Sequence, residues 1–241
     1  MRSVSKRLVW ITGASSGIGL ALAEGYANSG FSVIVSGRRK ALLNAVTKKI
    51  LDKGGTAHAI VCDVREKDLV EAASKEIVES FGIPEILLNN AGITVFKDFS
   101  NTSVEEFDDI MSTNLRGPFL TTKSILPYML ERRSGMILNI VSYAAKTTYT
   151  ASSAYAASKA GLAAMMEGLR AEVRSKGIKI VNVFPGAVLT PIWSPKVRTK
   201  HRDKMLTSKE AAKMICSISC QPSSMMVEEI VLRPQTGDIN E

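Results

Sequence analysis

Residues 8–19 read Leu-Val-Trp-Ile-Thr-Gly-Ala-Ser-Ser-Gly-Ile-Gly, and this stretch decides the fold class. Leu8 to Thr12 is a short apolar run that ends at a glycine, which predicts a strand buried on both faces. The three glycines and the helical pattern that follows to Asn28 predict a tight strand-to-helix turn. Glycines let a backbone approach a pyrophosphate, and a helix N-terminus favours its negative charge. The stretch therefore predicts a dinucleotide-binding loop, with an ordinary strand-to-helix turn as the alternative.

The rest of the chain alternates between strand-like and helical segments. Apolar runs over 31–36, 57–62, 85–88, 136–141, 178–184 and 225–232 predict further strands, and the segments between most of them have helical periodicity. This alternation predicts a parallel sheet covered by helices on both faces, in a single domain over residues 1–241. Residues 188–206 contain two prolines and no sustained periodicity, which predicts a loop over the site and a candidate lid.

Composition excludes several other classes of protein. The chain has 45% hydrophobic and 22% charged residues, a balance typical of globular proteins. No apolar run reaches transmembrane length, and the basic residues before Leu8 are followed by too short an apolar run for a signal peptide. We therefore expect a soluble, cytoplasmic protein without a membrane partner. Three cysteines and two separated histidines predict neither a disulfide framework nor a metal site. The net charge of +8 falls in patches without interleaved aromatics, so we expect no nucleic-acid partner.

Charged residues follow the second and third predicted strands. Gly37-Arg38-Arg39 stands where an acidic residue would bind the ribose hydroxyls of NADH, whereas arginine accommodates a 2′-phosphate. The pair predicts NADPH, with a stronger case for Arg38 than for Arg39 and with Ser15 as a second partner of the phosphate. Asp63, after the third strand, is a candidate acceptor for the adenine amino group, or a cap for the helix that begins near Glu66.

Tyr155 and Lys159 are four residues apart in an alanine-rich helical segment, so they share one helix face. Ser152 or Ser153 is the expected cap, which places Tyr155 in the first turn. There the helix dipole and the Lys159 ammonium would favour the phenolate and lower the tyrosine pKa. Such a tyrosine exchanges a proton near neutral pH. The pair alone also fits a surface helix without catalytic function.

Three further signals lie between the glycine loop and this helix. Asn89-Asn90-Ala91-Gly92 predicts a tight turn at the end of the fourth strand, and Ser142 ends the fifth. Asn114 separates two helical segments, 103–111 and 115–131, and predicts a local irregularity. Taken in order, with Tyr155-x-x-x-Lys159 and Pro185-Gly186, these motifs span the chain. Together they resemble those of the short-chain dehydrogenase/reductase family.

The resemblance implies a seven-stranded, doubly wound (Rossmann) parallel sheet and a catalytic tetrad. By position, Tyr155 is the general acid for carbonyl reduction, and Lys159 bonds the nicotinamide ribose and lowers the Tyr155 pKa. Ser142 holds the substrate carbonyl oxygen, and Asn114 holds a water that relays protons through Lys159. The family also implies a homo-oligomer, a dimer or more specifically a tetramer, built through the helices that carry Asn114 and Tyr155.

The motifs and the resemblance together predict a set of positions that bind NADP(H). These are Gly13, Ser15, Ser16, Gly17, Ile18, Gly19, Arg38, Arg39, Asp63, Val64, Asn90, Ala91, Gly92, Tyr155, Lys159, Pro185, Gly186, Val188 and Thr190. The expected substrate contacts are Ser142, Tyr155 and Trp193, where Trp193 either stacks on the substrate or anchors the lid on the core.

Two substrates compete for the predicted reduction. The chain ending and Pro191-Ile192-Trp193 resemble sepiapterin-reductase-like carbonyl reductases, which implies a ketone or dicarbonyl. A 3-oxoacyl-(acyl-carrier-protein) reductase is the alternative, because Arg132-Arg133 and Lys176 could face an acidic carrier and the basic run 196–204 could attract a phosphopantetheine group. The C-terminal segment departs from that subfamily's ending. Outside the enzymes, an NADP-binding regulatory protein is possible, but the complete tetrad argues against it.

Overall fold

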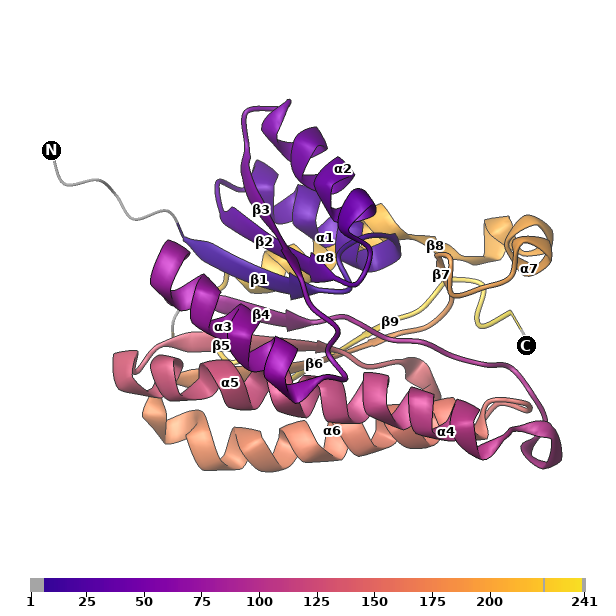
Figure 1. The fold of residues 1–241 in the computed structure, drawn as a ribbon. Coiled ribbons are helices and arrows are strands. Elements are labelled where there is room, and N and C mark those ends of the chain that lie inside the picture. Colours follow the sequence, from indigo (N-terminus) through magenta and orange to yellow (C-terminus); the bar gives the residue numbers. More distant parts are fainter. Residues whose placement is uncertain (1–6, 223, 240–241) are drawn as a thin grey trace, which may run out of the picture.

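The computed structural model describes residues 7–222 and 224–239, and a seven-stranded parallel sheet forms its centre (Figure 1). The strand order is β3-β2-β1-β4-β5-β6-β9. The bounds are β1 Leu8–Thr12, β2 Ser32–Gly37, β3 Thr56–Val61, β4 Ile86–Asn89, β5 Gly135–Ile140, β6 Ile178–Pro185 and β9 Glu229–Leu232. The order reverses between β1 and β4, and ligands of open α/β sheets bind at the carboxyl ends of the strands beside such a point.

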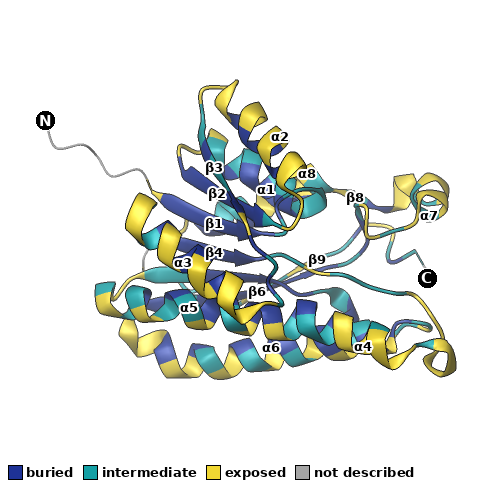
Figure 2. Ribbon diagram, viewed as in Figure 1, coloured by how far each residue is buried: buried dark blue, intermediate teal, exposed yellow. Residues whose placement is uncertain are grey.

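Helices cover both faces of this sheet (Figure 1). One layer holds α1 Gly17–Asn28, α2 Lys40–Leu51 and α8 Ser208–Ile218, and the other holds α3 Lys67–Phe81, α5 Gly117–Arg132 and α6 Ser153–Val173. Along β1, Val9 and Ile11 join the first hydrophobic core, whereas Leu8 and Trp10 join the second. Side chains alternate across a strand, so a strand with a helix layer on each side must be apolar throughout. Figure 2 shows the strands of the sheet as mostly buried. The doubly wound fold is confirmed.

A ladder of buried asparagines holds the central strands in register. Asn89, Asn139 and Asn182 are paired neighbours on β4, β5 and β6. The Asn89 amide donates to Asn139 Oδ1 at 2.9 Å, and the Asn139 amide donates to Asn182 Oδ1 at 3.2 Å. Buried amides cost free energy unless they are hydrogen-bonded, so a slip of one strand would leave them unpaired. The ladder therefore keeps the carboxyl ends of these strands level beneath the site.

The irregularity expected at Asn114 is confirmed. A π-helical turn, Ser112–Arg116, joins α4 Val104–Met111 to α5. Single π turns inside helices widen the backbone ladder and are frequent at functional sites.

The segment 188–206 has more regular structure than its sequence predicts. It forms two short strands, β7 Val188–Leu189 and β8 Leu206–Thr207, which pair in parallel, and the short helix α7 Pro195–Lys200. Ser194 caps α7 by accepting a hydrogen bond from the Val197 N–H. Six helical residues are too short for periodicity to reveal, and a two-residue strand forms only because its partner lies beside it.

Two expected caps and one strand boundary are also corrected. Ser152 occupies the N-cap position of α6, but its hydroxyl donates to the Tyr149 carbonyl instead of accepting from the helix. Glu66, not Asp63, is the N-cap residue of α3. The last strand is shorter than predicted and begins at Glu229. Within the described part of the chain, no helix combines the length and apolarity needed to cross a bilayer.

Candidate active site

The glycine loop is locked against the turn that follows β4. Gly13 has φ 64°, and a Cβ there would lie 2.7 Å from the Ala91 Cα. The Asn90 amide donates to the carbonyls of Thr12 and Gly13 at 2.9 and 3.1 Å. No side chain caps the N-terminus of α1, so its first N–H groups stay available to an anion. The loop thus fits a dinucleotide pyrophosphate, which glycine spacing alone could not establish.

At the end of β2, the structure places Arg39 against Ser15, and both Arg38 and Arg39 line the cavity. The Arg39 guanidinium donates to Ser15 Oγ at 2.9 Å, so these two residues of the predicted phosphate site lie together. Arg38 contributes instead to the positive potential at Asp63. Sequence analysis made the stronger case for Arg38, whereas the direction of each side chain depends on the backbone turn that follows β2.

Asp63 at the end of β3 is held by Arg65. The Arg65 guanidinium forms an ion pair with Asp63 Oδ2 at 2.8 Å, and the Arg65 N–H donates to Asp63 Oδ1 at 3.1 Å. Burial acts to raise the pKa of Asp63, but the hydrogen bonds and charge of Arg65 outweigh it, so the pKa lies below its usual value. The carboxylate is therefore ionised and oriented, as an acceptor for an adenine amino group must be.

Tyr155 and Lys159 lie where the helical spacing predicted. Tyr155 is the third residue of α6, and Lys159 Nζ is 5.9 Å from the centroid of its ring. Lys159 is 3% exposed, and its ammonium donates to the Ile140 carbonyl at 2.7 Å. Burial lowers the Lys159 pKa from its ordinary value of 10.5 to about 8. At neutral pH the buried Lys159 is charged, and burying this charge lowers the free energy of unfolding. This destabilisation decreases as the pH rises from about 8, the pKa in the folded protein, towards 10.5, the ordinary pKa of lysine.

The predicted fall in the Tyr155 pKa is wrong for this structure. Burial raises the pKa of the phenol, and only a hydrogen bond with the Ser142 hydroxyl acts to lower it. Sequence showed the favourable dipole and the nearby cation, but not the desolvation that opposes both. The hydroxyl of Tyr155 is therefore protonated at neutral pH, and like Ser142 it lines the cavity.

Asn114 does not line the cavity itself but is hydrogen-bonded to Ile93, which does. Its side chain is fully buried; the amide donates to the Ile93 carbonyl and to Ser158 Oγ, and Oδ1 accepts from the Ile93 N–H at 2.9 Å. A Cβ on Gly92 would lie 3.4 Å from both Asn114 Oδ1 and Lys159 Nζ. Asn114 thus fixes the chain that leaves β4 next to the Lys159 ammonium.

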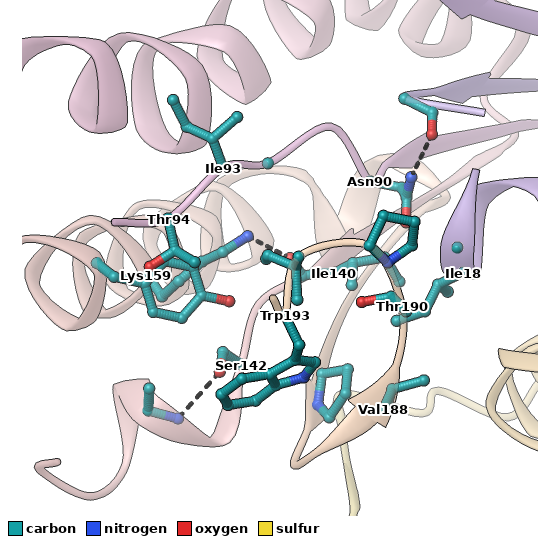
Figure 3. Close-up of a pocket in the computed structure, with 18 of the residues that line it drawn as sticks. Ile18, Asn90, Ile93, Thr94, Ile140, Ser142, Lys159, Val188, Thr190 and Trp193 are labelled. Carbon is teal, nitrogen blue, oxygen red and sulfur yellow. Dashed lines mark hydrogen bonds between the residues drawn. The ribbon is translucent and has the colours of Figure 1, made fainter. Parts of the chain in front are cut away.

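A cavity of about 1200 Å³ joins these groups at the carboxyl ends of the strands. Figure 3 shows how its walls come from separate segments: Ile18 from α1, Asn90, Ile93 and Thr94 after β4, Ile140 and Ser142 at the end of β5, and Thr190 and Trp193 after β6. Of the predicted site residues, Gly19 and Asn114 do not line the cavity. The others line the cavity: Gly13, Ser15, Ser16, Gly17, Ile18, Arg38, Arg39, Asp63, Val64, Asn90, Ala91, Gly92, Ser142, Tyr155, Lys159, Pro185, Gly186, Val188, Thr190 and Trp193.

Thr190 and Trp193 come close to other parts of the site. A Cβ on Gly17 would lie 3.2 Å from Thr190 Cγ2, so the segment after β6 reaches the glycine loop. The Trp193 ring stacks on Phe96, with centroids 4.9 Å apart and planes 9° from parallel. Trp193 therefore packs on the segment that follows β4, and not on the core as one hypothesis had it.

Sequence analysis missed several cavity residues. They are Ile93, Thr94, Phe96, Tyr149 and Asp238. Asp238 is 5% exposed, accepts a hydrogen bond from the Tyr149 hydroxyl and pairs with Arg233 at 2.8 Å. No local pattern links these positions, because the tertiary fold alone brings the C-terminal segment to the cavity. Among the described residues, no three His, Cys, Asp or Glu side chains cluster as a metal site would require.

Comparison with known proteins defines the class. Residues 7–201 match the family model of short chain dehydrogenases, and the chain belongs to that family, as its motifs indicated. It is 34% identical to a sepiapterin reductase of Chlorobaculum tepidum over 98% of this chain and 99% of that protein. It is 32% identical to an uncharacterized oxidoreductase of Staphylococcus saprophyticus over 97% of this chain and all of that protein.

Solved structures show the same fold. A metagenomic short-chain oxidoreductase in complex with NADP is 27% identical, with a TM-score of 0.85 over 97% of this chain and 99% of that one. An actinorhodin polyketide ketoreductase variant with NADPH is 28% identical, with a TM-score of 0.89 over 97% of this chain and 98% of that one.

Proposed function

We propose that this protein reduces a ketone or dicarbonyl substrate to an alcohol with NADPH. The observation that carries the proposal is the convergence of Ser142, Tyr155 and Lys159 on one cavity with the glycine loop and the Arg39–Ser15 pair. The same groups would be unnecessary in an NADP-binding regulatory protein, which is why we favour the enzyme.

The roles follow from the geometry. NADPH, when bound, supplies the hydride that reaches the carbonyl carbon. The Ser142 and Tyr155 hydroxyls, which line the same cavity, form a pair of donors for the carbonyl oxygen. Tyr155 gives its proton to that oxygen, because its raised pKa keeps the hydroxyl protonated until negative charge develops beside it. The buried Lys159 ammonium stabilises the phenolate left on Tyr155.

Asn114 acts as a positioning residue in this proposal. Its side chain holds Ile93 and Ser158, which fixes the turn after β4 and the α6 helix relative to each other. The π turn around it supports the family role of a water relay to Lys159, since such turns free backbone carbonyls from the helical ladder.

Three observations support NADPH as the cofactor. No acidic residue follows β2, Arg39 and Ser15 form a bonded pair there, and the solved relatives described above contain NADP or NADPH. An acid at this place would bond ribose hydroxyls and repel a 2′-phosphate.

We predict that Arg39→Ala weakens NADPH binding roughly 10- to 100-fold, the value of one or two charge-assisted hydrogen bonds. NADH, which lacks the 2′-phosphate, should keep its affinity within about twofold. Fluorescence titration of both cofactors measures this preference. Arg38→Ala is the matched control, since it removes the same charge one residue away and should have the smaller effect. Equal losses for NADPH and NADH in Arg39→Ala would contradict the assignment.

The substrate is proposed to be a ketone or small dicarbonyl. The stacked Phe96 and Trp193 rings line the cavity and suit a compact or flat molecule, and the sepiapterin reductase of C. tepidum is a full-length relative. A 3-oxoacyl-(acyl-carrier-protein) reductase is the second candidate. It is favoured by the exposed cations Lys196, Lys200, Arg202 and Lys204, which lie in the same segment as the cavity residues Arg198 and His201.

We also propose a homo-oligomer, a dimer or tetramer, built through α4, α5 and α6. Val104 and Phe107 on α4 and Phe119 on α5 are large apolar side chains left 42–70% exposed. Exposed apolar surface of this kind is typical of protein–protein contacts.

NADPH oxidation by the purified protein, followed with diacetyl and with acetoacetyl-CoA, tests the proposed substrate. We expect kcat/KM for the diketone to exceed that for the thioester by roughly tenfold or more. A ratio of this size corresponds to the gain or loss of one favourable contact between the substrate and its pocket. The reverse preference would assign the protein to acyl-chain reduction and give the exposed cations a role in carrier binding. No turnover of either compound, with NADPH bound, would leave the reductase proposal without support.

A further inference from the structure

Two buried polar atoms of the cavity lack a protein partner. Within the described residues, Thr94 Oγ1 and Arg198 Nε are both inaccessible to solvent and form no hydrogen bond, and both residues line the cavity. An unpaired buried polar group costs about 1–3 kcal/mol, and more when it is charged. Native proteins leave few such groups unpaired. Because both residues line one cavity, a ligand that turns these side chains towards it would complete their bonding.

Arg198 differs from the other cations of its segment. Residues 196–204 carry five lysines and arginines, and of these only Arg198 lines the cavity. None of the ion pairs formed within residues 7–222 and 224–239 includes it. His201, three residues further, also lines the cavity, so the two nitrogen-bearing side chains share one face of the chain around α7.

The topology places Arg198 at the substrate end of the cavity. Arg38, Arg39 and Asp63 mark the adenosine end, at β2 and β3. The α7 helix follows β6, which β1, β4 and β5 separate from β2 and β3 in the strand order. Figure 1 shows α7 beside β7 and β8, at the carboxyl ends of the strands. Thr94 and Arg198 belong to the two segments that meet at the Phe96–Trp193 stack.

The acids of the cavity do not neutralise this cation. Asp63 is paired with Arg65, and Asp238 is paired with Arg233 and hydrogen-bonded to Tyr149. Among residues 7–222 and 224–239, Arg198 is therefore a positive charge at the substrate end without a carboxylate partner. Arginine binds carboxylate and phosphate oxygens through forked hydrogen bonds, and a threonine hydroxyl can donate one more.

We propose that Arg198 and Thr94 bind an oxyanion, a carboxylate or phosphate group, carried by the substrate away from its reacting carbonyl. This inference rests on the proposed reductase function and narrows its substrate to an acidic carbonyl compound. The same chemistry could serve the diphosphate of the cofactor, and the two sources give different results when cofactor and substrate are varied separately.

The test compares para-carboxybenzaldehyde with its uncharged methyl ester, two aldehydes with the same ring. In Arg198→Met, which keeps the length of the aliphatic stem, KM for the acid should rise roughly 10- to 100-fold. KM for the ester and the Kd of NADPH should each stay within about twofold. Thr94→Val should raise KM for the acid alone by roughly fivefold, the value of a single hydrogen bond. Arg202→Met removes an exposed charge outside the cavity wall and should change neither KM.

Two results would overturn the inference while leaving the reductase in place. Equal rises in KM for acid and ester would make Arg198 a packing residue of its segment. A weaker Kd for NADPH with unchanged KM for the acid would assign it to the cofactor diphosphate.

If neither aldehyde is reduced, that result counts against the proposed reductase activity. A binding measurement then still tests the oxyanion site. Calorimetry with para-carboxybenzyl alcohol and the NADP-saturated protein requires no chemistry. Binding that Arg198→Met weakens tenfold or more supports the oxyanion site. If the alcohol does not bind the unaltered protein, or binds the unaltered protein and Arg198→Met with equal affinity, the oxyanion site is contradicted.

Discussion

Replacing Tyr155 with phenylalanine is expected to lower kcat for carbonyl reduction by roughly 10²- to 10⁴-fold, the range measured for loss of a general acid. The hydroxyl is the only group removed, and the ring stays at its place in the first turn of α6. The Lys159 ammonium keeps its bond to the Ile140 carbonyl. NADPH should therefore still bind with a Kd within a few-fold of the original value.

Tyr128→Phe is the matched control for this experiment. Tyr128 on α5 is partly buried in the second hydrophobic core and does not line the cavity, so the same loss of one hydroxyl should leave kcat unchanged. Single-turnover reduction, with NADPH absorbance as the signal, separates the chemical step from product release. If Tyr155→Phe retained full turnover, Ser142 or a water would have to supply the proton, and the role assigned to Tyr155 would fall.

Replacing Gly19 with alanine is expected to damage both stability and cofactor binding. A Cβ at this position would lie 2.4 Å from the Asn90 amide nitrogen and 2.5 Å from the Gly13 carbonyl oxygen. Those two atoms hydrogen-bond each other and lock the glycine loop to the turn after β4. We expect the free energy of unfolding to fall by about 1–3 kcal/mol, as for other overpacked sites, and NADPH affinity to fall by roughly tenfold or more.

Gly168→Ala supplies the comparison for Gly19→Ala. Gly168 also lies in a helix, α6, but within one subunit a Cβ there would meet nothing within 4 Å. Alanine restricts the unfolded chain and favours the helix, so this variant should gain about 0.5–1 kcal/mol with unchanged NADPH affinity. Urea unfolding and cofactor titration of both variants measure the difference. A Gly19→Ala protein with the original stability and Kd would show that the loop tolerates a side chain that these distances exclude.

Motifs whose chemistry is local were predictable from the chain alone. The apolar run before Gly13 indicated a buried strand, and the glycine spacing indicated a loop that approaches a ligand closely. The four-residue spacing of Tyr155 and Lys159 placed them on one helix face, and Asn114 indicated the break that the structure shows as a π turn. Each of these depends on backbone geometry within a few residues, which residue type and spacing determine.

Errors arose where a property depends on what surrounds a residue. Which of Arg38 and Arg39 meets Ser15 is set by a turn whose side-chain directions the sequence does not record. The Tyr155 pKa rises because the fold removes water from the phenol, a contribution that neither the helix dipole nor the nearby lysine reveals. Asp63 was a plausible cap in sequence, yet Arg65 holds it in the structure.

The amino-acid sequence by itself determined that this chain is a doubly wound α/β protein with a dinucleotide loop and a tyrosine–lysine pair. The tertiary structure alone decided which distant groups share the cavity: Phe96 with Trp193, Asp238 with Tyr149, and Thr94 with Arg198 as buried polar atoms without partners. The physical reason is the separation along the chain over which each kind of interaction acts. Strand, turn and helix preferences act between near neighbours in the chain, whereas desolvation, ion pairing and hydrogen-bond satisfaction depend on which segments the packed sheet brings together.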